Sequence, residues 1–169
     1  MSKQLKLQEL LDFCLATYTE ARPLNFDEDN VASCYKDYEG WTIDRKRAWV
    51  TLLSGAHYDI IDFSIINYSE TGTDSSQKYL RTWFKNLSAY LRSVDIVHGK
   101  PVANWLKEKP GHLLAAVYTV PDKDYSIYLA DERELTDNSA GQPIRGNIRF
   151  DLPEGSYELR TYSPETGLY

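Results

Sequence analysis

The order in which helical and strand-like patterns follow one another is the feature that most restricts the fold of this chain. Within the first 97 residues the two patterns alternate. Apolar residues recur at helical spacings of three and four in residues 3–18, 42–54 and 75–94. Between these segments lie two short apolar stretches typical of buried strands, residues 24–26 and 57–66. Alternation of this kind predicts parallel βα units.

The second part of the chain has a different pattern. After Gly99 the apolar residues fall only in short alternating stretches, at residues 113–120, 125–130, 144–150 and 156–162. Turn-forming segments separate these stretches, and "LPEG" at residues 152–155 is typical of a compact turn. The pattern predicts an antiparallel β-sandwich or part of one. We therefore expect an α/β unit at residues 1–97 and an all-β unit at residues 98–169.

Composition argues against several classes of function. The formal net charge of -6 makes nucleic acid and anionic membranes poor partners. Two cysteines and three scattered histidines favour neither a disulfide framework nor a metal site, so we expect no metal and no cofactor. The first 13 residues lack the apolar core of a signal peptide, and no stretch is long and apolar enough to span a membrane.

Three consecutive acids, Asp27, Glu28 and Asp29, follow the strand predicted at residues 24–26. Carboxylates this close repel one another, which raises their pKa values. One interpretation is a solvated turn, in which Asp29 accepts hydrogen bonds from the backbone N–H groups that follow it. The other is an active-site carboxylate at the carboxyl end of a strand, where barrel enzymes place their catalytic residues. The acids alone leave both interpretations open.

Several segments in order resemble one family. They are "NFDEDNVAS", "EGWTIDRKRAWVTLLSGAHYDIIDFSI", a long helix, "VYTVPDKDYSIYLA" and "FDLPEGSYELRTYSPETG". Together they are similar to the C-terminal part of apiosidase-like glycoside hydrolases, which are (β/α)8 barrels followed by a small β-sandwich named for collagen binding in a collagenase. The resemblance implies that residues 24–26 and 57–65 are the seventh and eighth barrel strands. It also implies that Glu28 is the catalytic nucleophile or base and that the substrate is a plant or other polysaccharide.

The resemblance further implies substrate contacts around Glu28. The candidates are Asp27, Asp29, Tyr35, Trp41 and Asp62. We expect Trp41 to be a sugar platform because it follows Gly40 in a predicted loop, and Asp62 to orient a sugar hydroxyl or to pair with a loop arginine. The alternative for Asp27 and Asp29 is a supporting or solvated role.

Other conspicuous residues favour structural roles. The charge run Arg45, Lys46 and Arg47 is typical of a solvated helix face. His57, at the amino end of the eighth strand, is expected to be structural. Trp49 is expected in the core because it lies inside a helix, and Trp105 is expected to pack the barrel part against the sandwich.

Hydrolysis of a glycosidic bond needs two carboxyl groups, and in this family the partner of Glu28 comes from an earlier strand, typically the fourth. We therefore expect the chain to be a fragment that is inactive alone, with a sandwich that stops early. One alternative is a non-catalytic module that binds carbohydrate or collagen through tyrosines such as Tyr128 and Tyr157. Another is a chain that completes its barrel with a separately encoded N-terminal segment or by self-association. The cellular location stays open, and a secreted parent protein is compatible with the sequence.

Overall fold

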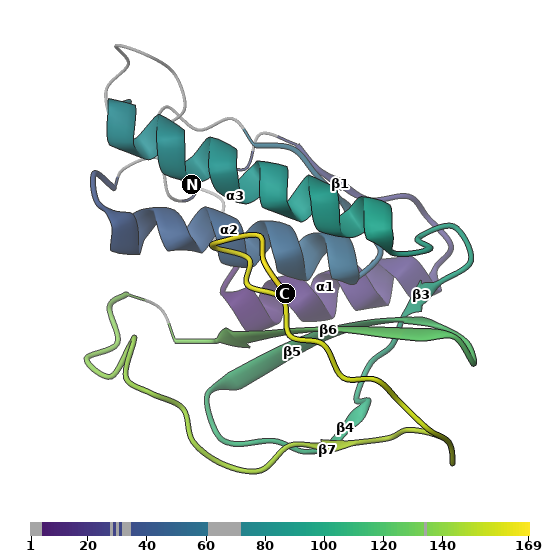
Figure 1. Ribbon diagram of the computed structural model, residues 1–169. Coiled ribbons are helices and arrows are strands. Elements are labelled where there is room, and N and C mark those ends of the chain that lie inside the picture. The colour runs from purple at the N-terminus through teal and green to yellow at the C-terminus, as the bar shows by residue number, and fades with distance from the viewer. Residues whose placement is uncertain (1–4, 28, 30, 32–34, 61–71, 134) are drawn as a thin grey trace.

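The computed structural model describes residues 5–27, 29, 31, 35–60, 72–133 and 135–169. The helices of this part are α1 (Leu7–Thr19), α2 (Tyr38–Leu53) and α3 (Asp74–Ser93). The strands are β1 (Asn25–Phe26), β2 (His57–Tyr58), β3 (Lys100–Pro101), β4 (Leu106–Glu108), β5 (Leu113–Val120), β6 (Asp124–Asp131) and β7 (Arg149–Phe150). Helices come first and antiparallel strands follow, so the predicted mixed architecture is confirmed at this level (Figure 1).

The two longer helices begin at side-chain caps. Asp37 precedes α2, and its Oδ1 accepts a hydrogen bond from Gly40 N at 2.8 Å. Thr73 precedes α3, and its hydroxyl accepts from Ser76 N at 3.0 Å while Ser76 Oγ accepts from Thr73 N. Because of the aspartate cap, α2 starts at Tyr38 and not at residue 42, and the loop predicted around Trp41 is helical.

The parallel pairing predicted for the first half is present. β1 and β2 pair in parallel, with Asn25 opposite His57 and Phe26 opposite Tyr58. In sequence α2 connects the two strands and α3 follows the second, which is the order of βα units. The strand predicted over residues 57–66 is assigned only at its first two positions, and residues 61–66 lie outside the described part.

The second half is organised around a long antiparallel hairpin. β5 and β6 pair over eight residues each, from Leu113 opposite Asp131 to Val120 opposite Asp124, and β3 pairs antiparallel with the other edge of β5. β4 and β7 form a separate short antiparallel pair. Residues 113–120 and 125–130 were thus placed correctly from sequence.

Two of the predicted strands are wrong in extent. The stretch 144–150 forms a strand only at β7, and 156–162 forms none. The alternating residues Tyr157 and Leu159 are both exposed, because no neighbouring strand pairs with this segment in the described part of the chain. An alternating pattern needs a partner strand before it becomes a ladder.

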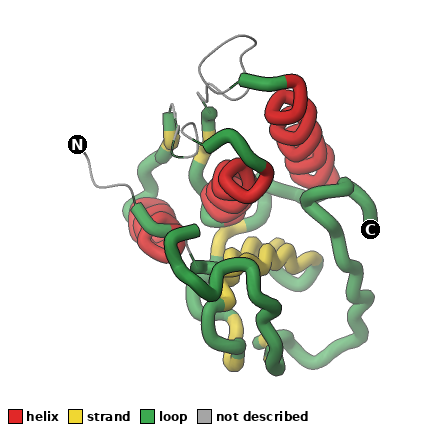
Figure 2. Tube along the Cα trace, turned by 90° about the vertical axis from the view of Figure 1, so that its left-hand side faces the viewer, coloured by secondary structure: helices red, strands yellow, loops and turns green. Residues whose placement is uncertain are grey.

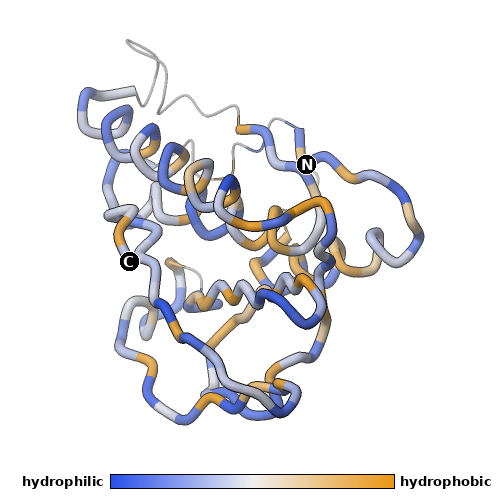
Figure 3. Tube along the Cα trace, turned by 45° about the vertical axis from the view of Figure 1, so that its right-hand side comes forward, coloured by the Kyte–Doolittle hydropathy of each residue, from blue (hydrophilic) through white to orange (hydrophobic). Residues whose placement is uncertain are grey.

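The elements form layers. α2 packs between α1 and α3 and directly on β5 and β6, so the helices cover one face of the hairpin, as the nearly end-on view in Figure 2 shows. The β4–β7 pair lies beyond the other face of the hairpin (Figure 1). Hydrophilic and hydrophobic positions recur turn by turn along α3, as expected of a helix with one covered side (Figure 3).

One hydrophobic cluster joins the two halves. It includes Leu10, Trp49 and Leu53 from the helices and Leu114 and Tyr128 from the sheet. The Trp49 ring stacks on Tyr128 with centroids 5.3 Å apart. The boundary expected near residue 98 therefore does not coincide with a break in the core. No described helix is long and apolar enough to cross a membrane.

Candidate functional site

The carboxyl ends of β1 and β2 lie side by side. Asp59 N donates to Phe26 O at 2.8 Å, and Asp29 N donates to Asp59 O at 3.1 Å, so the parallel hydrogen-bond pattern continues past both strands. Asp27 and Asp59 are exposed at this edge, and Asp29 is buried beside them. The edge therefore collects carboxyl groups from both strand ends, although Glu28 and Asp62 lie outside the described residues.

Asp29 forms a buried ion pair. Arg47 Nε donates to Asp29 Oδ2 at 2.7 Å, and the two side chains are only 7% and 5% exposed. Arg47 Nη1 also donates to Leu5 O at 2.9 Å, which ties the start of the chain to α2. Asp29 Oδ1 accepts from Val31 N at 3.4 Å, so the predicted backbone interaction is present. Asp29 thus fixes the turn after β1.

Tyr58, at the end of β2, belongs to the same buried group. Burial and the neighbouring carboxylates of Asp29 and Asp44 raise the pKa of Tyr58 well above its usual value. Asp44 is fully buried and comes from the same face of α2 as Arg47, one turn earlier. Charged and polar side chains thus join the apolar contacts of Phe26 and Tyr58 in connecting α2 to the β1–β2 edge.

The charge run on α2 is not a solvated face, so that prediction is wrong. Besides the buried Arg47, the Arg45 guanidinium lies 4.4 Å from the centre of the Trp83 ring. Lys46 Nζ donates to Asp131 O at 2.8 Å, at the end of β6. Each of these cations therefore links α2 to another part of the fold.

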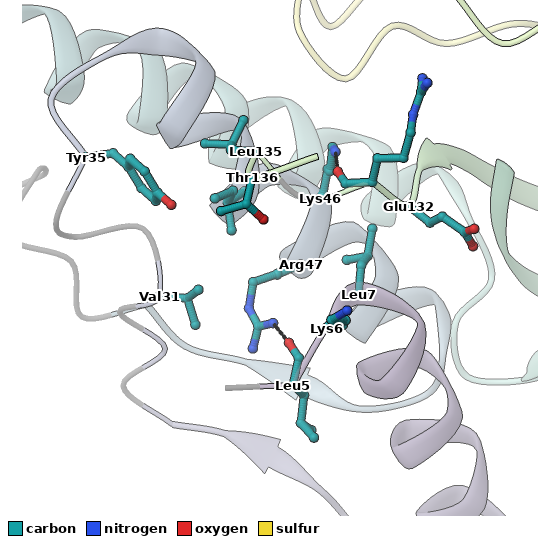
Figure 4. Close-up of a pocket in the computed structure, with 12 residues that line it drawn as sticks. Leu5, Lys6, Leu7, Val31, Tyr35, Lys46, Arg47, Glu132, Leu135 and Thr136 are labelled. Carbon is teal, nitrogen blue, oxygen red and sulfur yellow. Dashed lines mark hydrogen bonds between the residues drawn. The ribbon is translucent and has the colours of Figure 1, made fainter. Parts of the chain in front are cut away.

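A cavity of about 220 Å³ lies beside this group. Val31, Tyr35 and Arg47 line it from the first half of the chain, and Leu135 and Thr136 line it from the loop after β6 (Figure 4). Most small-molecule sites measure about 300–1,000 Å³. The described cavity is therefore too small for an extended substrate.

The remaining sequence candidates fall in different surroundings. Tyr35 is half-buried and lines the cavity. Trp41 is only 3% exposed, packs with Leu80 and Trp83, and its Nε1 donates to Tyr35 O at 3.2 Å. A ring buried in this way leaves no open face for a sugar. His57 is exposed at the start of β2.

Sequence reasoning missed the role of Arg47 and Tyr58. A signal was present for Arg47, because Asp44, Thr51 and Ser54 recur with it at helical spacing and all are buried. Among the described residues no group of three or more His, Cys, Asp or Glu side chains lies close enough to hold a metal ion. The exposed Asp27 and Asp59 at the edge carry carboxyl groups, which are of a type that serves in proton transfer or nucleophilic attack.

Comparison with known proteins adds no relative to this picture. No protein-family model, no curated protein and no solved structure matches the chain. Function has to be argued from the residues and their geometry.

Proposed function

We propose that residues 1–97 are the last two βα units of a (β/α)8-barrel glycoside hydrolase of the apiosidase-like kind, and that residues 98–169 are part of the β-sandwich that follows. The observation that carries this proposal is the parallel β1–β2 pair with acids directly after both strands. In barrel enzymes the active site lies at the carboxyl ends of the strands. The substrate class is a glycosidic bond of a plant or other polysaccharide.

Glu28 is the acid we assign to catalysis. Its sequence neighbours Asp27 and Asp29 lie at the carboxyl edge, and Asp29 is held there by Arg47. A glycosidase needs a second carboxyl group, about 5 Å away for retention and farther for inversion. The resemblance puts that group on an earlier strand, and Asp59 and Asp62 are expected to contact sugar hydroxyls instead.

The outer edges of β1 and β2 favour the proposal that this pair belongs to a larger sheet. Within the described residues β1 pairs only with β2, and β2 only with β1. A closed barrel would pair both outer edges. We therefore expect the isolated chain to show no turnover and to need a complementary barrel segment, encoded upstream or separately.

The test combines gene context with activity. The DNA upstream of the Met1 codon is sequenced, and any barrel-like coding segment is expressed together with this chain and assayed on a panel of aryl glycosides and plant polysaccharides. We expect hydrolysis by the assembled protein, none by the 169-residue chain alone, and loss of activity in Glu28→Gln. Glu39→Gln, at an exposed glutamate in the first turn of α2, is the matched control and should retain most activity. Unchanged hydrolysis in Glu28→Gln would refute the assignment.

A further inference from the structure

A second and larger cavity lies on the face of the hairpin away from the helices. Its volume is about 690 Å³, within the range of about 300–1,000 Å³ that is usual for small-molecule sites. Trp105, Tyr125, Phe150 and Tyr157 supply aromatic rings to it. Side chains alternate between the two faces of β6. Ser126 and Tyr128 are buried on one face, so Tyr125 lies on the other. We call this cavity the aromatic groove.

The rings of the aromatic groove contact one another in a continuous row. Trp105 is almost buried at its base, stacked on Tyr125 with centroids 5.4 Å apart and an interplanar angle of 18°. Phe150 lies on Trp105 at 5.7 Å, and Tyr157 meets Tyr125 edge to face at 6.1 Å. The row runs from Phe150 of β7 through Trp105, which directly precedes β4, to Tyr125 of β6 and ends at Tyr157.

Tyr157 is the exposed member and is held in position. Its side chain is 49% exposed. Its hydroxyl donates to Pro153 O at 2.8 Å, and its ring lies against Gly155, where an added Cβ would be 3.4 Å from Cε2. The "LPEG" segment predicted as a turn, residues 152–155, thus supplies both contacts that position this ring. A ring fixed before binding loses little conformational freedom when a ligand arrives.

The charges around the aromatic groove narrow the ligand class. Its lining includes the carboxyl groups of Asp122, Asp124, Glu154 and Glu158 and a single lysine, Lys123. Lys123, the one cation in this lining, has its Nζ 3.5 Å from Asp95 Oδ2, and four acidic residues surround it, so the lining as a whole is negative and repels an anionic ligand. Acceptors beside flat rings suit a molecule with hydroxyl donors at its edges and C–H groups on its faces.

We propose that the aromatic groove binds a neutral oligosaccharide, with one sugar ring on Tyr157 and its hydroxyl groups donating to the lining carboxylates. An anionic glycan or a nucleic acid is disfavoured by the same carboxylates. This site is separate from the β1–β2 edge and does not depend on Glu28.

The test is a titration of the 169-residue chain with xylohexaose, cellohexaose and mannohexaose, monitored by calorimetry and by tryptophan fluorescence. Hexagalacturonic acid serves as the anionic probe and spermine as the cationic one. We expect saturable binding of at least one neutral hexasaccharide, with weaker binding of both charged probes. Tighter binding of spermine, or no binding of any neutral probe, would overturn the proposal.

Three single-residue variants test whether the oligosaccharide binds in the aromatic groove. Tyr157→Ala should weaken association by about tenfold, which corresponds to about 1.4 kcal/mol. Tyr157→Phe keeps the ring but loses the hydroxyl with its bonds to Pro153 and Tyr125, so it should weaken binding much less than Tyr157→Ala does. Tyr169→Ala removes an exposed ring outside the aromatic groove and is the control. Equal effects of Tyr157→Ala and Tyr169→Ala would contradict the assignment. Binding that persists in Glu28→Gln keeps this outcome distinct from that of the proposed hydrolase.

Discussion

The Asp29–Arg47 pair is the strongest single-residue constraint on the turn after β1. Arg47→Met removes the cation and leaves the Asp29 carboxylate buried without its partner. Breaking one side of a buried pair costs about 3–5 kcal/mol, so we expect the free energy of unfolding in urea to fall by that amount. Arg160→Met, which breaks the exposed pair with Glu158, should leave the free energy of unfolding almost unchanged. Equal small losses in both variants would show that Arg47 is not buried with Asp29.

Asp131 gives a prediction for acid conditions. Burial alone would raise its pKa, but hydrogen bonds from the Arg133 side chain and from the Arg133 and Gly141 amides lower the pKa from 3.8 to about 2. A lowered folded-state pKa stabilises the protein above the unfolded value, and this stability is lost as pH falls from about 4 to about 2. We expect Asp131→Asn to cost roughly 2 kcal/mol at pH 6 and almost nothing near pH 2. The measurement is the urea midpoint of the parent and of Asp131→Asn between pH 2 and pH 6. A difference in stability that does not change with pH would contradict the prediction.

At the same scale, sequence reasoning succeeded for Trp49 but failed for Trp41, which is buried, and for the buried polar residues. Trp49 was expected in the core because of its helical position, and it lies there. Arg47 was assigned to solvent because a run of three basic residues is usually hydrated, yet each of these cations has a specific partner. Such partners come from distant segments, which local periodicity does not reveal. The side chain proposed for catalysis, Glu28, is not part of the described structure.

At the scale of elements, the start of α2 can be tested through Gly40. Alanine normally stabilises a helix relative to glycine by about 1 kcal/mol. At Gly40, however, an added Cβ would lie 2.1 Å from Cβ of Tyr35, so the loop that carries Tyr35 would have to move. We expect Gly40→Ala to lower the free energy of unfolding by about 1–3 kcal/mol, as overpacking does. The control is Ala89→Gly on the exposed side of α3, where glycine should destabilise the helix by the usual amount of about 1 kcal/mol. A more stable Gly40→Ala would contradict the described packing.

The elements that sequence reasoning placed well are those whose pattern is long. α3 and the β5–β6 hairpin each carry enough periodic residues to define their type. The short pairs β3–β5 and β4–β7 depend on contacts between segments that are distant in sequence, and two or three residues carry no usable period. The stretch at residues 156–162 has the alternation of a strand but no partner. A barrel and a complete sandwich therefore remain predictions, since each described sheet has only two or three strands.

At the scale of the whole molecule, the C-terminal residues connect the two halves. Asn86 Nδ2 on α3 donates to Pro164 O at 3.2 Å and to Glu165 O at 3.0 Å, and Tyr162 donates back to Asn86 O at 2.9 Å. Gly167 adopts a positive φ of 74° directly beside the Asn86 amide. The "SPETG" motif thus docks the end of the chain on the helical layer. With the shared core around Trp49, it makes the halves one packing unit despite their different patterns.

This shared core predicts a single unfolding transition. Tyr128 lies on β6 but stacks on Trp49 of α2, so Tyr128→Ala should remove packing from helices and sheet together. We expect a loss of about 3–5 kcal/mol, as for other core aromatic-to-alanine changes, and equal losses of amide hydrogen-exchange protection in α2 and β5. Leu159→Ala, at a residue that is 78% exposed, should change neither the free energy of unfolding nor the exchange protection of α2 and β5. If α2 kept its protection while β5 lost its own, the halves would be independent domains. Coincident losses would mean that any complementary barrel segment must dock on a chain that is already folded as one body.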